Sequence, residues 1–307
     1  MEPSLPIAKH FHIFGFPVSS SKSPILHGAG FKHHNLPHTY DIRNCEKLDE
    51  STIALIRDPA FGGASVTMPH KSIIHKYLDS STPLATLLGA VNTIVPKKDA
   101  ASGKIELVGD NTDWVGILRL LKQELKPEHE FDITCSGLVI GAGGAGRAAV
   151  YALHELGLST IYLYNRTAST ARAVKAAFPS SYNIVIIPSL AAENFKSGAP
   201  ICIVGTVPAS ATSIDETPSP PGLYLDRDCV SRKQGGVLID MAYLPRRTPL
   251  VRLAENKQEW VVQTGIMVLL TQGYAQFEMW NGLKAPEKEI REAVLAAYDA
   301  ENPIEKV

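Results

Sequence analysis

The chain has 307 residues, a length that suggests two domains of ordinary size rather than one. Hydrophobic residues make up 45% of it and charged residues 20%, a globular balance that argues against long disordered regions. The formal net charge of -1 gives no electrostatic reason to expect nucleic acid or an anionic membrane as a partner.

Signals for export, membrane insertion and metal binding are weak. Residues 1–6 lack the basic start and apolar core of a secretory signal, and no window reaches the ~18 consecutive apolar residues that span a bilayer. The ten histidines match no HExxH pattern. The cysteines lie far apart, without metal-ligand spacing: Cys45, Cys135, Cys202 and Cys229. We therefore expect a reduced, cytoplasmic protein that binds no metal.

The first 126 residues predict short strands that alternate with helices. A β-rich run covers Lys9–Phe16, and a helix begins near Ser23 and Pro24, with Ser23 as its N-cap. A strand at Gly63–Thr67 leads to a further helix start after Pro69. The following elements are a polar hairpin tip at 97–106 and a helix at 114–126 with apolar residues at helical spacing.

From Leu138 onward, strands and helices alternate in a pattern typical of an open α/β sheet. The expected strands are Val139–Ile140, Thr160–Tyr164, Ile184–Ile187, Pro200–Val204 and Val237–Ile239. The expected helices are Arg147–Leu156, Ala168–Phe178, Gly265–Trp280 and Glu287–Tyr298, and the Ser-, Thr- and Pro-rich segment Ser213–Pro221 is expected to be a loop. This alternation favours a parallel sheet.

A glycine-rich turn, GAGGAG, stands between the strand at Val139–Ile140 and the following helix, which is the context of a dinucleotide-binding turn. In such a turn, Gly141 permits the tight bend, Gly143 lets the backbone approach a pyrophosphate, and Gly146 lets helix and strand pack closely. The helix N-terminus presents free N–H groups to the phosphates. The candidate cofactor-binding residues here are Gly141, Gly143, Gly144, Ala145 and Gly146.

The end of the next strand bears on which dinucleotide binds. An enzyme that uses NAD commonly has Asp or Glu there, to accept hydrogen bonds from the ribose 2′-hydroxyl. This chain has Arg166 instead, flanked by Asn165 and Thr167. A guanidinium suits a 2′-phosphate, so NADP is preferred and NAD stays possible. The alternative is a solvated surface arginine.

Polar residues follow several strands of the N-terminal half. Ser21 and Ser23 lie beside a turn, Thr67 and Lys71 flank Pro69, and Asn92 and Asp113 come later in the chain. Each one alone is explained by a turn or a helix cap. Together, a lysine, an aspartate and several hydroxyl and amide groups would suit a small polyhydroxylated acid.

These elements together closely resemble the shikimate dehydrogenases, including the shikimate/quinate group. The matching elements, in chain order, are Ser21-Lys22-Ser23-Pro24, Val66-Thr67-Met68-Pro69-His70-Lys71, Gly89–Thr93, Gly109–Asp113, the glycine-rich turn with Arg147, Asn165-Arg166-Thr167, Asp240-Met241-Ala242-Tyr243, Thr248-Pro249-Leu250, Gly265 and Gln272. They cover nearly the whole chain in the family's order.

The resemblance implies an α/β protein with a substrate-binding domain at 1–113, a doubly wound NADP-binding Rossmann domain at 114–264, and C-terminal helices at 265–307 that return to the substrate domain. It also implies that substrate binds in the cleft between the domains. The implied activity is reversible hydride transfer between NADPH and 3-dehydroshikimate in aromatic amino acid biosynthesis, by a monomer or homodimer.

The resemblance also implies a role for each matching residue. Lys71 and Asp113 would flank the oxygen that changes oxidation state, where an ammonium stabilises the developing charge and supplies the proton. The substrate carboxylate would be held by Ser21 and Ser23 with the help of Tyr243, and the ring hydroxyls by Thr67, Asn92 and Gln272. Met241 and Gly265 would lie near the nicotinamide.

The sequence departs from the family pattern at a few places. Ser65 stands where the family usually has Asn, and Ser20 where a histidine is common. Gly205–Pro208 replaces the usual Asn-Ala-Thr-Ser, and Thr170 replaces a basic residue whose part Arg172 could take. These departures leave the preferred ring acid and the nicotinamide geometry open.

Several alternatives therefore stay open. The substrate could be quinate or an amino-substituted analogue instead of shikimate. The chain could also be a non-catalytic regulator that senses these acids, although the intact Lys71, Asp113 and glycine-rich turn argue against that. A folate-type dehydrogenase with a similar plan is disfavoured by the elements at Ser21–Pro24 and Gly109–Asp113.

Overall fold

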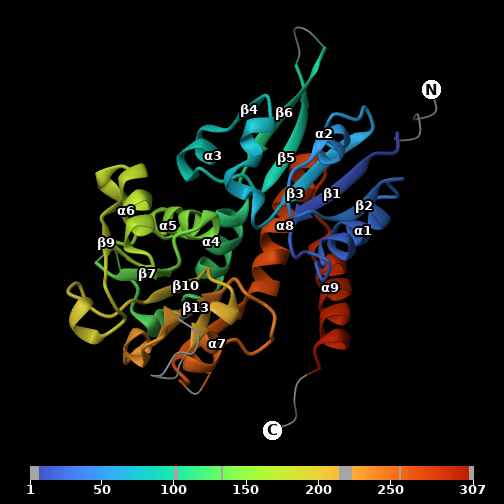
Figure 1. Cartoon of the computed structure of the whole chain (residues 1–307). Coiled ribbons are helices and arrows are strands. Elements are labelled where there is room, and N and C mark those ends of the chain that lie inside the picture. The colour runs from blue at the N-terminus through green and yellow to red at the C-terminus, as the bar shows by residue number, and fades with distance from the viewer. Residues whose placement is uncertain (1–6, 100–102, 133, 214–222, 256, 304–307) are drawn as a thin grey trace. The chain divides into compact units, whose positions relative to one another are not determined.

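The computed structural model describes residues 7–99, 103–132, 134–213, 223–255 and 257–303 (Figure 1). The chain divides into two compact units, one formed by residues 1–112 and 272–307 and the other by residues 113–271. Among the helices of the described ranges, none combines the length and the apolar character needed to cross a membrane.

The N-terminal unit is built on a mixed sheet with the strand order β2-β1-β3-β5-β6-β4. Its strands are β1 (His10–Gly15), β2 (Thr39–Asn44), β3 (Phe61–Val66), β4 (Ser80–Ser81), β5 (Thr93–Lys98) and β6 (Ile105–Asp110). β1 pairs in parallel with β2 and β3, whereas β5 is antiparallel to both β3 and β6. Its helices are α1 (Ser23–His33), α2 (Glu50–Ile56), α3 (Pro83–Leu88) and α9 (Glu287–Glu301).

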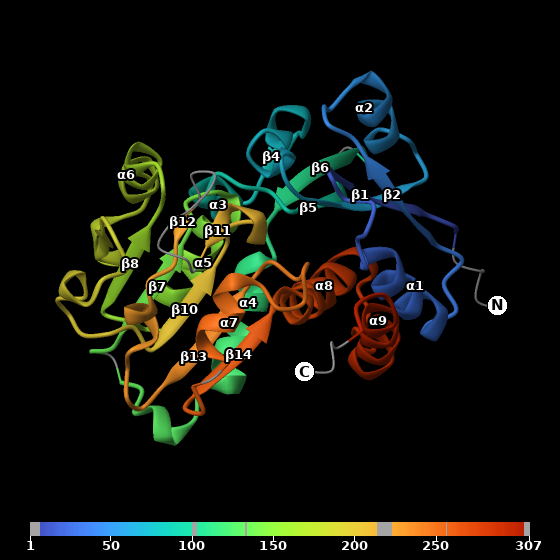
Figure 2. The ribbon, with the colours of Figure 1, turned by 60° about the horizontal axis from the view of Figure 1, so that its bottom comes forward.

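The C-terminal helices return to this unit. α8 (Gly265–Asn281) begins in the second unit and ends in the first. Near its end, the Trp280 indole N–H donates to the Ile94 carbonyl at 2.9 Å. The Phe277 ring fills the space in which a side chain at Gly30 of α1 would stand, and α9 lies against α1 (Figure 2).

The second unit contains an all-parallel sheet with the strand order β14-β13-β10-β7-β8-β9. Its strands are β7 (Ser136–Ile140), β8 (Thr160–Tyr164), β9 (Ile184–Ile186), β10 (Cys202–Gly205), β13 (Gly236–Asp240) and β14 (Trp260–Thr264). In order of appearance along the chain this is the doubly wound 3-2-1-4-5-6 arrangement, whose direction reverses between β7 and β10. The remaining elements are α4 (Asp113–Glu124), α5 (Gly144–Glu155), α6 (Ala168–Ala177), α7 (Pro249–Ala254), β11 (Thr212–Ser213) and β12 (Leu223–Tyr224).

The predicted fold class is confirmed: a mixed N-terminal sheet, an all-parallel second sheet, and C-terminal helices that contact the N-terminal part. The central strands of the second sheet were predictable because helices cover both faces and every residue of β7 and β13 is buried. The loop predicted at 213–221 lies outside the described residues except for Ser213, which ends β11.

Two local predictions are wrong. Ser23 is the first helical residue of α1 and not its N-cap, which is Lys22. The segment after Pro69 forms two short 3-10 turns, His70–Ser72 and Ile74–Tyr77, in place of an α-helix. The Lys71 carbonyl accepts the N–H of Val91 at 2.8 Å, a bond to a distant segment instead of one within a helix.

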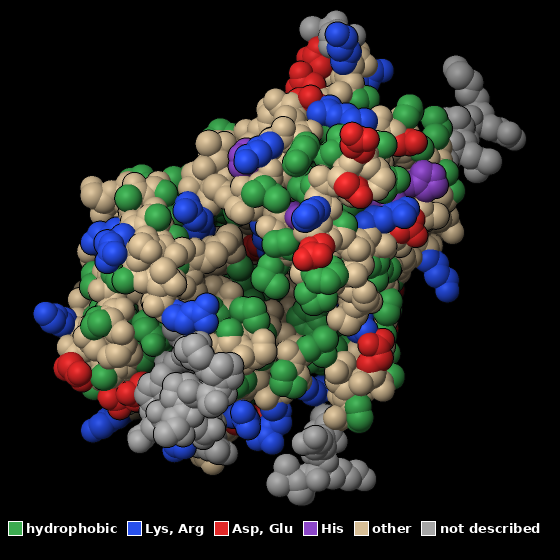
Figure 3. All heavy atoms as spheres, in the orientation of Figure 1, with side chains coloured by type: hydrophobic (Ala, Val, Ile, Leu, Met, Phe, Trp, Pro, Cys, Tyr) green, Lys and Arg blue, Asp and Glu red, His purple; other side chains and the backbone are tan. Residues whose placement is uncertain are grey.

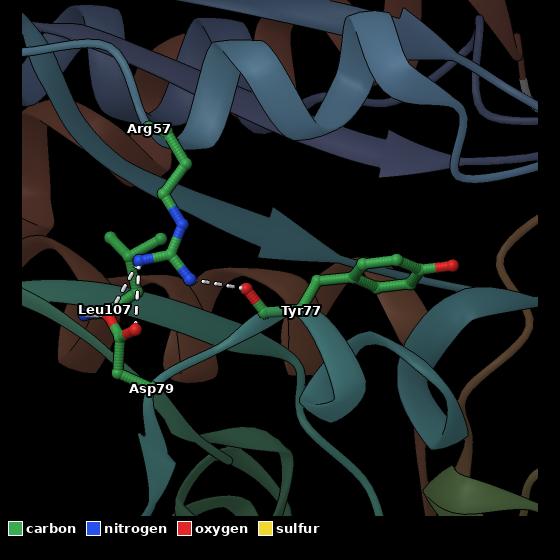
Figure 4. A network of polar contacts seen from close by, with 4 residues as sticks. All are labelled: Arg57, Tyr77, Asp79 and Leu107. Carbon is green, nitrogen blue, oxygen red and sulfur yellow. Dashed lines mark hydrogen bonds and ion pairs between the residues drawn. The ribbon is translucent and has the colours of Figure 1, made fainter.

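Charged groups also fix the layout of the N-terminal unit. The Arg57 guanidinium lies between the Asp79 carboxylate, at 2.7 and 3.0 Å, and the Tyr77 carbonyl, at 2.9 Å (Figure 4). Asp79 in turn accepts the N–H of Leu107 at 2.7 Å, so this network ties the end of α2 to β6. On the molecular face drawn in Figure 3, basic and acidic side chains are interspersed.

Candidate functional site

The glycine-rich turn lies directly after β7, at the point where the strand order of the second sheet reverses. Gly141 has a φ of 109°, which L-residues rarely adopt. A Cβ on Gly146 would stand 2.2 Å from the Gly141 carbonyl oxygen, so only glycine allows α5 to start this close to the strand. A Cβ on Gly143 would meet no atom within 4 Å, and this residue is exposed. The turn therefore offers an open backbone at the N-terminus of α5.

The end of β8 lies beside this turn, because Ile140 and Tyr164 are paired in the parallel sheet. The Asn165 side chain accepts the N–H of Ala142 at 3.2 Å and donates to the Thr167 carbonyl at 2.9 Å. Asn165 thus braces the glycine-rich turn itself. Arg166 follows it in the sequence and is exposed.

The ends of β13 and β14 bring together two further predicted residues. A Cβ on Gly265 would lie 2.0 Å from the Met241 carbonyl oxygen, so α8 starts in direct contact with the backbone after β13. Asp240 is buried there and accepts the Thr248 hydroxyl at 2.6 Å and the Ala242 N–H at 3.1 Å. Burial, only partly offset by these bonds, raises the pKa of Asp240 to about 6.

Most other predicted site residues lie in the N-terminal unit. The hydroxyls of Ser21 and Ser23 are 3.2 Å apart, both residues are buried, and Ser21 Oγ also accepts the N–H of Ser23. Thr67 and Lys71 are half-buried around the first 3-10 turn. The bond from the Ser23 N–H to Ser21 Oγ helps to shape the turn that presents the two serine hydroxyls.

Asn92 and Gln272 come together although 180 residues separate them. Asn92 Nδ2 donates to Gln272 Oε1 at 3.2 Å and to the Thr112 hydroxyl at 3.0 Å. Thr112 donates its N–H to Asn92 Oδ1 at 2.7 Å and its hydroxyl to Gln272 Oε1 at 2.9 Å. Asp113, which is buried, follows this cluster directly as the first residue of α4.

The structure does not test every predicted grouping. Lys71 belongs to the N-terminal unit, whereas Asp113 and Tyr243 belong to the second, so the pairing of Lys71 with Asp113 stays a prediction. Sequence reasoning missed two members of the buried polar cluster: Thr112, and Gln276, whose Nε2 donates to the Asn92 carbonyl at 3.2 Å. The signal for Gln276 was its position one helical turn after Gln272 on α8.

Comparisons with known proteins agree with this geometry. Residues 13–94 match the family described as the shikimate dehydrogenase substrate binding domain, and residues 265–295 match the shikimate 5'-dehydrogenase C-terminal domain. The pentafunctional AROM polypeptide of Malassezia globosa is 44% identical over 294 residues, which are 95% of this chain and 18% of that polypeptide. The chain thus spans less than a fifth of the length of this curated relative.

Solved structures give the same result. The dehydroquinate dehydratase and shikimate dehydrogenase part of Schizosaccharomyces pombe AroM is 37% identical, with a TM-score of 0.73 over 94% of this chain and 53% of that one. Shikimate 5-dehydrogenase from Thermus thermophilus, in complex with NADP(H) and shikimate, is 28% identical, with a TM-score of 0.71 over 94% of this chain and 99% of that one. The chain belongs to the shikimate dehydrogenase family.

Two departures from the shikimate dehydrogenase pattern now have a structural context. Thr206 donates both its N–H and its hydroxyl to the Ile140 carbonyl, at 2.8 and 2.9 Å, and so ties the end of β10 to the end of β7, directly before the glycine-rich turn. Ser65 is buried and donates its hydroxyl to Gln276 Oε1 at 2.9 Å. Both substituted residues are therefore built into the polar framework of their unit.

Proposed function

We propose that this chain is an NADP-dependent shikimate dehydrogenase, which reversibly transfers a hydride between NADPH and 3-dehydroshikimate to give shikimate. The observation that carries the proposal is the match, over 94% of the chain, to an enzyme structure in complex with NADP(H) and shikimate. This chain has the matching parts in both units: a polar cluster in the first and a glycine-rich turn in the second. The domain roles predicted from the sequence are part of the proposal.

The glycine-rich turn fits a dinucleotide. The space beside Gly143 is open, and the N–H groups of the first turn of α5 point toward that end of the helix. Arg166 is proposed to bind the 2′-phosphate through charge-assisted hydrogen bonds, which favours NADP over NAD. Met241 and Gly265 are proposed to lie beside the nicotinamide ring, and the bound cofactor supplies the hydride donor.

The N-terminal unit is proposed to hold the ring acid. Ser21 and Ser23 would bind its carboxylate with the assistance of Tyr243, and Thr67, Asn92 and Gln272 would bind its hydroxyls. Buried amides whose partners are already fixed are suited to this task, because little reorganisation is needed when the ligand binds. A ligand that lacks a matching hydroxyl leaves such groups unsatisfied, which gives selectivity.

Lys71 and Asp113 are proposed to act at the reacting oxygen. When a hydride adds to the ring carbonyl, negative charge develops on that oxygen, and the Lys71 ammonium stabilises the charge and gives up a proton to form the hydroxyl. Asp113 orients the ammonium and the hydroxyl. In the oxidative direction, Lys71 takes the proton back as the hydride leaves.

The direct test measures the absorbance of the reduced nicotinamide with shikimate and with quinate, each in the presence of NADP and of NAD. We expect the highest kcat/KM with shikimate and NADP. Quinate is the second candidate substrate, because Ser65 stands where the family usually has Asn. Turnover of none of the four pairs would contradict the proposal and favour a sensing role.

A variant tests the role of the lysine. We expect Lys71→Ala to lower kcat by about 100-fold or more, the usual contribution of general acid–base catalysis, with a far smaller effect on KM. The exposed Lys97 at the end of β5 provides the matched control, Lys97→Ala. If Lys71→Ala kept nearly the kcat of the control, the proposed acid–base role would be wrong.

A further inference from the structure

A continuous series of hydrogen bonds, buried from Ser65 inward, runs into the predicted substrate-binding amides from a side on which no site residue was predicted. The Tyr40 hydroxyl on β2 donates to Ser65 Oγ on β3 at 2.6 Å, and Ser65 donates to Gln276 Oε1 on α8 at 2.9 Å. Ser65 is 6% exposed and Gln276 is 1% exposed. Burial raises the pKa of the Tyr40 hydroxyl, so the phenol stays protonated and able to donate.

The chain continues from the other end of the same amide. Gln276 Nε2 donates to the Asn92 carbonyl at 3.2 Å and to the Thr93 hydroxyl at 2.9 Å. Thr93 then donates to Asn92 Oδ1 at 2.7 Å. Tyr40 is therefore connected through Ser65, Gln276 and Thr93 to the Asn92 side chain.

Two backbone groups fix the donor and acceptor of every hydrogen bond in this series. The Asn92 carbonyl can only accept, so the nitrogen of Gln276 must face it, and the oxygen of Gln276 must face Ser65. Ser65 must then donate to Gln276, and it accepts from Tyr40. At the far end, the Thr112 N–H can only donate, so Asn92 Oδ1 faces it and Asn92 Nδ2 faces Gln272.

Aromatic packing holds the first member of the chain in place. The fully buried His27 ring stacks on the Tyr40 ring, with ring centroids 4.7 Å apart and planes 9° apart. Trp280, one turn after Gln276 on α8, packs against His27 at 4.8 Å. The Tyr40 ring and the Trp280 ring, which lies on the same helix as Gln276, thus pack in one cluster around His27.

We propose that Gln276 is a positioning residue for substrate binding: it orients the Asn92 and Gln272 amides and replaces the side-chain amide that the family usually carries at position 65. Ser65 accepts the Tyr40 hydroxyl and donates its own hydroxyl to Gln276 Oε1. This inference rests on the proposed function, because Asn92 and Gln272 are taken as ligands of the ring hydroxyls. It adds a residue of α8 that acts on substrate binding indirectly, by bracing the Asn92 side chain through Thr93.

The test compares Gln276→Leu with Tyr274→Phe in the full chain. Leu keeps much of the volume and removes both ends of the amide. The control Tyr274→Phe removes a hydroxyl on the same helix that donates to the Glu287 carbonyl at 3.2 Å, a bond that does not belong to the series from Tyr40 to Asn92. For Gln276→Leu we expect the KM for shikimate to rise about tenfold, the scale of one lost hydrogen bond, while the KM for NADP stays within about twofold. Tyr274→Phe should leave both constants unchanged.

A rescue variant separates positioning from simple loss of stability. Gln276→Ala should raise the KM for shikimate as Gln276→Leu does, and the added Ser65→Asn should restore it to within about threefold, because an amide again faces Thr93. If Gln276→Leu does not fold, the pair Gln276→Ala and Gln276→Ala with Ser65→Asn carries the test alone.

The outcomes are distinguishable. A wild-type protein that turns over shikimate, with variants of Gln276 that keep its KM or with no rescue by Ser65→Asn, would overturn the positioning role and leave the proposed function intact. A wild-type protein that turns over neither ring acid with either cofactor would overturn the proposed function and the inference together.

Discussion

We expect alanine substitutions at two glycines of the same turn, Gly143→Ala and Gly146→Ala, to affect different properties, namely cofactor affinity and stability. Gly146→Ala should destabilise the protein without a cofactor present, whereas Gly143→Ala should fold normally and lose affinity for NADP. The reason is geometric: an added Cβ lies 2.2 Å from the Gly141 carbonyl oxygen at position 146 and meets nothing within 4 Å at position 143.

The expected magnitudes follow from these contacts. At position 146 the clash is with backbone, so α5 or the turn must shift; overpacking of this kind costs about 1–3 kcal/mol. The gain from replacing a helical glycine by alanine is about 1 kcal/mol, which leaves a net loss of up to about 2 kcal/mol. At roughly 2–4 °C per kcal/mol, this corresponds to a fall in Tm of up to about 8 °C. At position 143, the φ of -81° and ψ of -169° suit any L-residue, so stability should be unchanged or rise by up to about 1 kcal/mol.

The assay is thermal unfolding of wild type and both variants without cofactor, followed by titration with NADP. In the Gly143→Ala protein, the methyl group occupies the space in which the pyrophosphate should approach, and we expect at least about a tenfold weaker Kd, equivalent to the loss of one good hydrogen bond. The reasoning would be refuted if the two apo variants had the same Tm, or if Gly143→Ala bound NADP as tightly as wild type does.

Further predictions concern pH and cofactor choice. Burial lowers the pKa of His27 to about 3, so between pH 6.5 and 3 only the unfolded chain binds this proton. Wild-type stability therefore falls by about 1.4 kcal/mol per pH unit as the pH drops through that window. In urea unfolding at pH 7.5 and pH 5, His27→Phe should lose less stability than wild type, and an equal loss in both proteins would contradict this. Asp240 gives the opposite pH dependence of stability, because burial raises its pKa to about 6. The folded state holds the proton between pH 3.8 and 6, so wild-type stability falls as the pH rises through that range. The free energy of unfolding of Asp240→Asn, measured by chemical unfolding, should therefore increase by about 3 kcal/mol relative to that of wild type between pH 4 and 7, and no relative increase would contradict this. Arg166→Ala should raise the KM for NADP by about tenfold or more, the scale of a charge-assisted bond, and leave that for NAD nearly unchanged; equal effects on both would rule out a 2′-phosphate contact.

The second unit was the more predictable one, for a physical reason. Its central strands are short apolar runs because helices cover both faces of a parallel sheet, and glycines such as Gly157, with a φ of 95°, end its helices in a conformation that few other residues adopt. The glycine-rich turn could likewise be read directly, because its chemistry depends on the absence of side chains at adjacent positions.

The N-terminal unit was less predictable. The edge strand β2 (Thr39–Asn44) was not expected, because an edge strand has polar residues on exposed positions and shows no apolar run. α2 was missed as well: it spans only Glu50–Ile56 and buries few side chains. Such short elements are held by tertiary contacts, among them the Arg57 network at the end of α2, and not by a periodic pattern in their own sequence.

The same distinction explains what could be predicted of the candidate site. Residues such as Asn92 and Lys71 lie in compact motifs, so their chemistry is visible locally, whereas Gln276 acquires its position only when α8 packs against β3, 211 residues away from Ser65. Taken alone, Ser65 is a position at which the amide side chain usual in the family is absent. Because the backbone carbonyl of Asn92 dictates which end of the Gln276 amide faces that serine, the substitution at one position and the glutamine at the other form a single hydrogen-bonded unit. A departure from a family motif is therefore weak evidence of altered chemistry until the side chains that pack against it have been examined.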